Sequence, residues 1–128
     1  MPLTRAQIDQ IYTHILTGIF GMVVGSQLDI ALRQHFLDSP DELRTLTDDI
    51  IEDLLYDDNS DAANVRTDIR LMVYHKRTLQ SFTRFLLYRT TTDDGSPESV
   101  EDWLAISNDD FLAYRRTPIG VVWLSGPF

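Results

Sequence analysis

Residues 61–89, DAANVRTDIRLMVYHKRTLQSFTRFLLYR, decide the fold because they form the longest stretch with one consistent hydrophobic period. Apolar side chains recur there at helical spacing, and the stretch contains neither glycine nor proline. A helix of this length is about 40 Å long, which is enough to cross a small domain. We therefore expect a central helix over residues 61–89, with these side chains facing inward: Val65, Ile69, Met72, Leu79, Phe82 and Leu86.

Capping signals predict two helices before this stretch. Thr4 begins a T-x-x-Q capping box, and the apolar periodicity that follows predicts a helix to about Phe36, with a kink in the glycine-rich part. Ser39 followed by Pro40 is a strong helix start, and its helix is expected to run to about Tyr56. On a helical wheel, the second helix turns these apolar residues to one face: Leu43, Leu46, Ile50 and Leu54.

Two further starts follow the central helix. Ser96 with Pro97 predicts a short helix, and Ser107 with Asp110 predicts another turn or two through Tyr114, with Arg115 and Arg116 at the C-terminal end. The expected fold is therefore all-α, with four or five helices around one long central helix. It forms a single helical domain over residues 1–117, followed by an extended or strand-like apolar tail, residues 118–128.

Composition narrows the classes of function. The 128 residues include no cysteine, so disulfides, thiolate metal sites and cysteine nucleophiles are excluded. The net charge of −9 makes nucleic-acid binding an unfavoured function. Neither a secretory signal nor a run apolar enough for a membrane span is visible. We expect a cytoplasmic protein, or part of a particle assembled inside the cell, without cofactor or metal.

Charge is segregated along the chain. Residues 38–61 carry a net charge of −9, residues 62–90 carry +5, and residues 91–114 carry −7. Within the first acidic segment, like charges four residues apart repel one another on a helix. If no arginine of the same chain lies beside it, this strip is a candidate docking surface for a basic protein, and the favoured interpretation is an ordinary solvated face. The strip consists of Asp48, Asp49, Glu52 and Asp53.

Arginines of the basic segment fall within a narrow arc of the expected central helix. Guanidinium groups in such a stripe suit phosphate or an acidic partner. The favoured interpretation is that the stripe faces the acids of its own chain or solvent. The stripe consists of Arg66, Arg70, Arg77 and Arg84.

The apolar C-terminal tail, residues 118–128, is the third candidate surface for binding a partner. Its side chains are too apolar to be stable in water, so they either fold back on the core or dock on another subunit. The residues concerned are Val122, Trp123, Leu124 and Phe128.

The sequence gives little support for the known motifs of metal sites and catalytic sites. Asp57, Asn59 and Asp61 match oxygen positions of a calcium loop, but Ala62 stands where the loop needs glycine, so a polar connection is favoured. Gly21 and Gly25 form a G-x-x-x-G spacing, which we interpret as close helix packing. The three histidines lack zinc-site spacing, and no nucleophile motif is visible.

The sequence favours a non-catalytic protein-interaction or assembly protein, such as a structural component of a virion or multiprotein complex. Its partner would be another protein or a second copy in a homo-oligomer. One alternative is an acidic inhibitor or immunity-type protein that covers a basic site on its partner. Another is a small enzyme whose site forms only in the fold.

Overall fold

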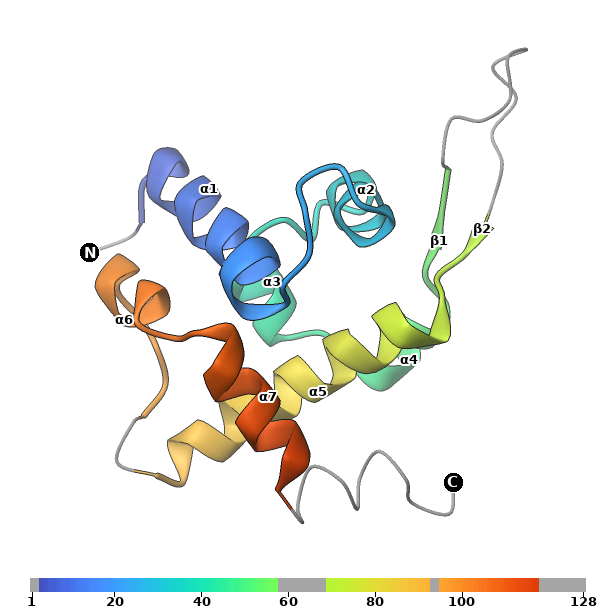
Figure 1. The fold of residues 1–128 in the computed structure, drawn as a ribbon. Helices are drawn as coiled ribbons and strands as arrows, with labels where there is room; N and C mark the ends of the chain where they lie inside the picture. The colour runs from blue at the N-terminus through green and yellow to red at the C-terminus, as the bar shows by residue number, and fades with distance from the viewer. Residues whose placement is uncertain (1–2, 58–68, 93–94, 118–128) are drawn as a thin grey trace.

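The computed structural model describes residues 3–57, 69–92 and 95–117 (Figure 1). These residues confirm the all-α class, with a small two-stranded sheet as the one addition. In chain order the elements are α1 (Arg5–His14), the π-helix η1 (Ile15–Ile19), α2 (Gln27–Gln34), α3 (Pro40–Arg44), α4 (Asp48–Glu52), β1 (Leu55–Tyr56), β2 (Ile69–Arg70), α5 (Val73–Thr90), α6 (Val100–Leu104) and α7 (Asn108–Arg116).

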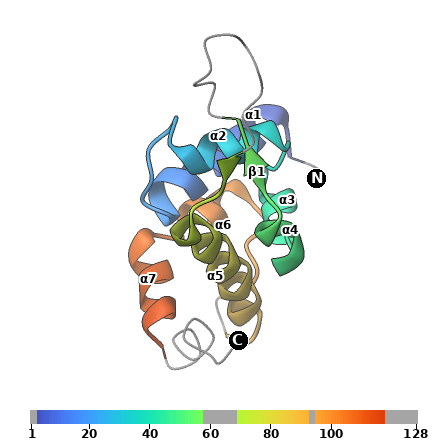
Figure 2. The ribbon, with the colours of Figure 1, turned by 90° about the vertical axis from the view of Figure 1, so that its right-hand side faces the viewer.

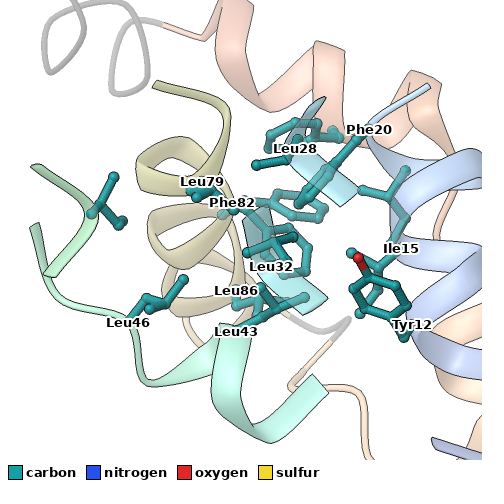
Figure 3. Close-up of a cluster of buried hydrophobic side chains, with 14 of the residues drawn as sticks. Tyr12, Ile15, Phe20, Leu28, Leu32, Leu43, Leu46, Leu79, Phe82 and Leu86 are labelled. Atoms are coloured by element: carbon teal, nitrogen blue, oxygen red, sulfur yellow. The ribbon is translucent and has the colours of Figure 1, made fainter. Parts of the chain in front are cut away.

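Helix α5 is the central element, and its inner face is the middle of the core (Figure 3). Leu79, Phe82 and Leu86 are buried, as the helical period predicts. The Phe82 ring packs edge-on against Phe20, with 5.0 Å between ring centroids. The same ring lies 6.1 Å from Phe111 of α7 and 6.3 Å from Trp103 of α6. One side chain of α5 therefore joins three segments that are distant in sequence.

The central helix begins later than the sequence predicts. Ile69–Arg70 is a strand, and α5 starts only at Val73 after the extended residue Met72. Burial alternates there with a period of two: Leu71 is buried, whereas Arg70 and Met72 are exposed. The inward placement of Met72 is therefore wrong, and Val65 lies outside the described residues.

Strand β2 is held by an antiparallel partner. Leu55 pairs with Arg70 and Tyr56 with Ile69. Side chains from the end of α2 also bind the backbone beside β1. The amide of Gln34 accepts from Asp57 N and donates to the Asp57 carbonyl, and the His35 ring binds the Leu55 carbonyl. These tertiary hydrogen bonds favour the extended conformation over continued helix.

The helix expected from Ser39 to Tyr56 is divided into α3 and α4. Ser39 caps α3 as predicted, but the helix ends at Arg44. Thr47 then caps α4 by accepting a hydrogen bond from Ile50 N, with acids in the first turn of α4. The break rotates α4, so Ile51 is buried and Ile50 is 48% exposed, contrary to the predicted inward face.

The N-terminal helix is interrupted in the glycine-rich part. The predicted Thr4 capping box is present, and α1 passes into η1, which ends at Ile19. Gly21 and Gly25 have φ values of 72° and 88°, so both lie in a loop rather than on a helix face. The prediction of close helix packing at these glycines is wrong. Ser26 caps α2 after the loop.

The C-terminal helices begin with capping boxes. Ser99, not Ser96, caps α6, because Pro97 is buried and its carbonyl accepts a hydrogen bond from Arg44. Ser107 with Asp110 caps α7 as predicted. Asn108 donates to the Ile19 carbonyl at 2.7 Å, which joins the start of α7 to the end of η1.

At Gly18 of η1, replacing glycine with alanine is expected to destabilise the fold, although the same change stabilises an open helix. A Cβ added there would lie 2.5 Å from Cε1 of His14, whose Nε2 donates to the Ile106 carbonyl at 2.7 Å. In an open helix, replacing glycine with alanine adds about 1 kcal/mol of stability. Here Gly18→Ala should lower the free energy of unfolding by about 1–3 kcal/mol, since the ring must move.

Urea denaturation measures this change, with Thr17→Ala as a neighbouring exposed control. Combining Gly18→Ala with His14→Ala should remove most of the extra cost of Gly18→Ala, since no ring then opposes the methyl group. A stabilised Gly18→Ala protein would contradict the close contact.

Candidate interaction surface

The acidic strip is only partly free. Arg84 of α5 donates to both carboxylate oxygens of Asp48, at 3.0 and 2.6 Å. Lys76, which is largely buried, places its Nζ 3.4 Å from Oε2 of Glu52 and donates to the Glu52 carbonyl at 3.2 Å. Hydrogen bonding from Arg84 lowers the pKa of Asp48. Asp48 and Glu52, two of the four residues of the strip, therefore hold α4 against α5.

The other half of the strip faces solvent. Asp49 and Asp53 are exposed, and Ile50 stands between them in the sequence. Neither carboxylate forms an ion pair with a residue of the described ranges. We call Asp49, Ile50 and Asp53 the α4 face.

The arginine stripe does not exist as predicted. Arg70 lies on strand β2, outside the helix, so it does not share the helical arc. Arg84 is paired with Asp48, which confirms the interpretation of internal pairing for that residue. Arg77 is exposed on α5, and Arg66 lies outside the described residues.

A different surface is formed at the start of α5. The consecutive side chains Met72, Val73 and Tyr74 are 54%, 64% and 56% exposed. Arg77 follows one helical turn after Tyr74. Sequence reasoning assigned Met72 to the core and did not single out Val73 or Tyr74, because the alternation of burial between Leu71 and Met72 is set by the strand before α5 and is visible only in the structure.

Arg115 of α7 is half-buried, with its guanidinium carbon 5.5 Å from the centroid of the Phe111 ring. It lies within electrostatic reach of both Tyr74 and Arg77. Burial lowers the pKa of Arg115, and the like charge of Arg77 lowers it further. No described carboxylate lies within ion-pair distance of Arg77 or Arg115. We call Met72, Val73, Tyr74, Arg77 and Arg115 the α5 edge; Figure 2 shows the start of α5 between α4 and α7.

A buried polar cluster, which sequence reasoning missed, lies between α1 and α2. Asp29 is 2% exposed, and its oxygens accept from the Tyr12 hydroxyl at 2.6 Å, Gly25 N at 2.7 Å and Arg33 Nε at 2.9 Å. Burial opposes ionisation of Asp29, but these hydrogen bonds outweigh it and hold its pKa below the usual value. Burial, together with the bond to Asp29, raises the pKa of Tyr12. With both oxygens occupied, Asp29 joins the two helices.

Other predicted features lie partly outside the described residues. The tail residues Val122, Trp123, Leu124 and Phe128 are outside them, as is most of the calcium-like loop after Asp57. In the described ranges, no three histidine or acidic side chains are grouped so that they could hold a metal ion. Within the same ranges, no helix has the length and apolar character needed to cross a membrane.

Comparisons with protein-family models, curated proteins and solved structures find no match to this chain.

The Asp29 cluster predicts a specific dependence of stability on pH. The folded-state pKa lies below the unfolded value of about 3.9, so ionised Asp29 stabilises the fold above that value and loses its effect as pH falls through the folded pKa. Asp29→Asn should lower the free energy of unfolding at pH 7 by about 1–3 kcal/mol. It should also flatten the loss of stability below about pH 4.

Denaturation at several pH values measures both effects, with Asp9→Asn as an exposed control. If the Asp29→Asn protein loses stability in acid as steeply as the wild type, Asp29 is not the group responsible.

The pair between Asp48 and Arg84 can be measured by a double-mutant cycle. Both side chains are partly exposed, so we expect Asp48→Asn and Arg84→Met to couple by only about 0.5–1 kcal/mol. The matched cycle with Asp49→Asn and Arg84→Met should show no coupling beyond error. Equal coupling in the two cycles would contradict the specific pairing.

Proposed function

We propose that this protein acts without catalysis, as a protein-interaction or assembly protein. The supporting observation is the α5 edge, where three consecutive large apolar side chains are each more than half exposed. Single exposed apolar residues are common on protein surfaces, but three in succession expose more apolar area at one end of the helix than a single residue would, and exposed apolar area is a feature of interaction sites. Tyrosine and arginine are also the residue types most often found at the energetic centre of interfaces.

The charges of the α5 edge support the same proposal. In a chain of net charge −9, Arg77 and Arg115 lie near each other without a described carboxylate to pair with. A partner that carries carboxylates and an apolar group would neutralise both charges and cover the exposed side chains. A role as a structural component of a larger assembly is consistent with such a surface.

The proposal predicts that removing apolar atoms from the α5 edge weakens partner binding. The double variant Val73→Ser, Tyr74→Ser should weaken partner binding at least about tenfold, because these side chains supply most of the apolar contact. The fold should persist, since both residues are exposed. Partners are first identified by pull-down from the native source and mass spectrometry. Affinity and circular dichroism are then measured with purified components.

The matched control is Val23→Ser, Val24→Ser, which changes another exposed apolar pair, 71% and 61% exposed, elsewhere on the surface. We expect this control to bind like the wild type. Binding that survives the α5-edge substitutions, or falls equally in the control, would contradict the proposal.

The acidic inhibitor remains a second candidate, supported by the exposed carboxylates of the α4 face. Asp49→Lys with Asp53→Lys should then abolish binding to a basic partner, and wild-type binding should weaken steeply with salt. If the α4-face variant binds normally while the α5-edge variant does not, the inhibitor hypothesis is wrong.

A further inference from the structure

The α4 face and the α5 edge are complementary in charge. The α4 face has two exposed carboxylates and the half-exposed Ile50, and the α5 edge has the exposed Arg77 one helical turn after Tyr74, with the half-buried Arg115 within electrostatic reach of both. Within one copy these groups do not neutralise one another, because α4 contacts α5 through other side chains. Asp48 pairs with Arg84, and Glu52 pairs with Lys76.

Helices α4 and α5 lie side by side, so each copy carries the two surfaces on neighbouring elements (Figure 1). A two-fold axis lets a surface of one molecule contact a different surface of the other twice, since residue i meets residue j and j meets i. Two charge-complementary contacts would then form in one closed dimer. In such a dimer the half-exposed Ile50 of each copy would lie opposite the exposed apolar side chains of the α5 edge.

We propose that two copies of this chain associate through a two-fold contact, in which the α4 face of each copy lies on the α5 edge of the other. This inference rests on the proposed interaction function and assigns its partner as a second copy. A standard interface has roughly 20–30 residues on each side, whereas the α4 face and the α5 edge together comprise eight. The dimer therefore exchanges readily, and its dissociation constant rises with salt.

Charge exchange tests the proposed dimer. In the full-length chain, Arg77→Glu and Asp53→Lys each place like charges opposite one another in both contacts of a homodimer. Each variant should raise the dissociation constant at least about tenfold, measured by sedimentation over micromolar to millimolar concentration. An equal mixture of the two variants should regain the wild-type affinity with 1:1 stoichiometry, because opposite charges then meet in both contacts.

Arg5→Glu and Asp9→Lys are matched controls, since they make the same charge changes on the exposed side of α1. Both controls should dimerise like the wild type. A wild-type protein that stays monomeric throughout, or a mixture that does not regain affinity, would overturn the inference.

Cysteine crosslinking gives a second measurement that does not depend on charge. The chain has no cysteine, so introduced thiols are the only ones present. A mixture of Arg77→Cys and Asp53→Cys proteins should form a crosslinked dimer under mild oxidation at least about tenfold faster than a mixture of Arg77→Cys and Asp9→Cys. Equal crosslinking rates in the two mixtures would contradict the proposed dimer.

The two proposals fail separately. If the wild type is monomeric but the Val73→Ser, Tyr74→Ser protein loses a captured partner, the interaction function stands and the second copy is excluded. If the dimer forms and charge exchange restores it, both proposals are supported.

Discussion

The packing of aromatic rings around Phe82 is the contact on which the rest of the fold depends. Phe20 after η1, Trp103 of α6 and Phe111 of α7 all place their rings near this one side chain of α5. Several helices of the chain are only one or two turns long, too short to be stable alone in water. Burial of their apolar side chains against α5 supplies the stability that their own hydrogen bonds do not.

Polar contacts then fix the orientation of elements that the core alone would leave adjustable. Asp29 joins α2 to Tyr12 of α1, and Lys76 joins α5 to the end of α4. Gln34 and His35 bind the backbone beside β1, which positions the short sheet next to α2. The contacts of Asp29, Lys76 and His35 involve buried or half-buried groups, so losing one partner leaves the other without its hydrogen bond, whereas the Gln34 contacts are exposed.

These internal contacts also decide which charges remain available to a partner. The basic and acidic segments of the chain partly neutralise each other where α4 and α5 pack together. Of the charged side chains on and beside these two helices, Asp49 and Asp53 of the α4 face and Arg77 of the α5 edge remain exposed. The surface that supports the proposed function therefore depends on the fold. In the sequence, Met72 fits the period of a buried helix face, but the strand before α5 leaves it exposed.

The sequence by itself determined the all-α class, the helix starts at Thr4, Ser39 and Ser107, and the inward face formed by Leu79, Phe82 and Leu86. Capping and helical periodicity act between residues three or four positions apart, so a single segment contains the information.

Only the tertiary structure decided that Ile69–Arg70 is a strand, that Asp29 is a buried link, and that Arg115 comes within electrostatic reach of Tyr74. Each of these depends on a partner distant in sequence: β1, Tyr12 of α1, and helix α7. The physical reason is that local preference is worth only about 1 kcal/mol per residue, and a hydrogen-bonded or buried tertiary contact readily exceeds it.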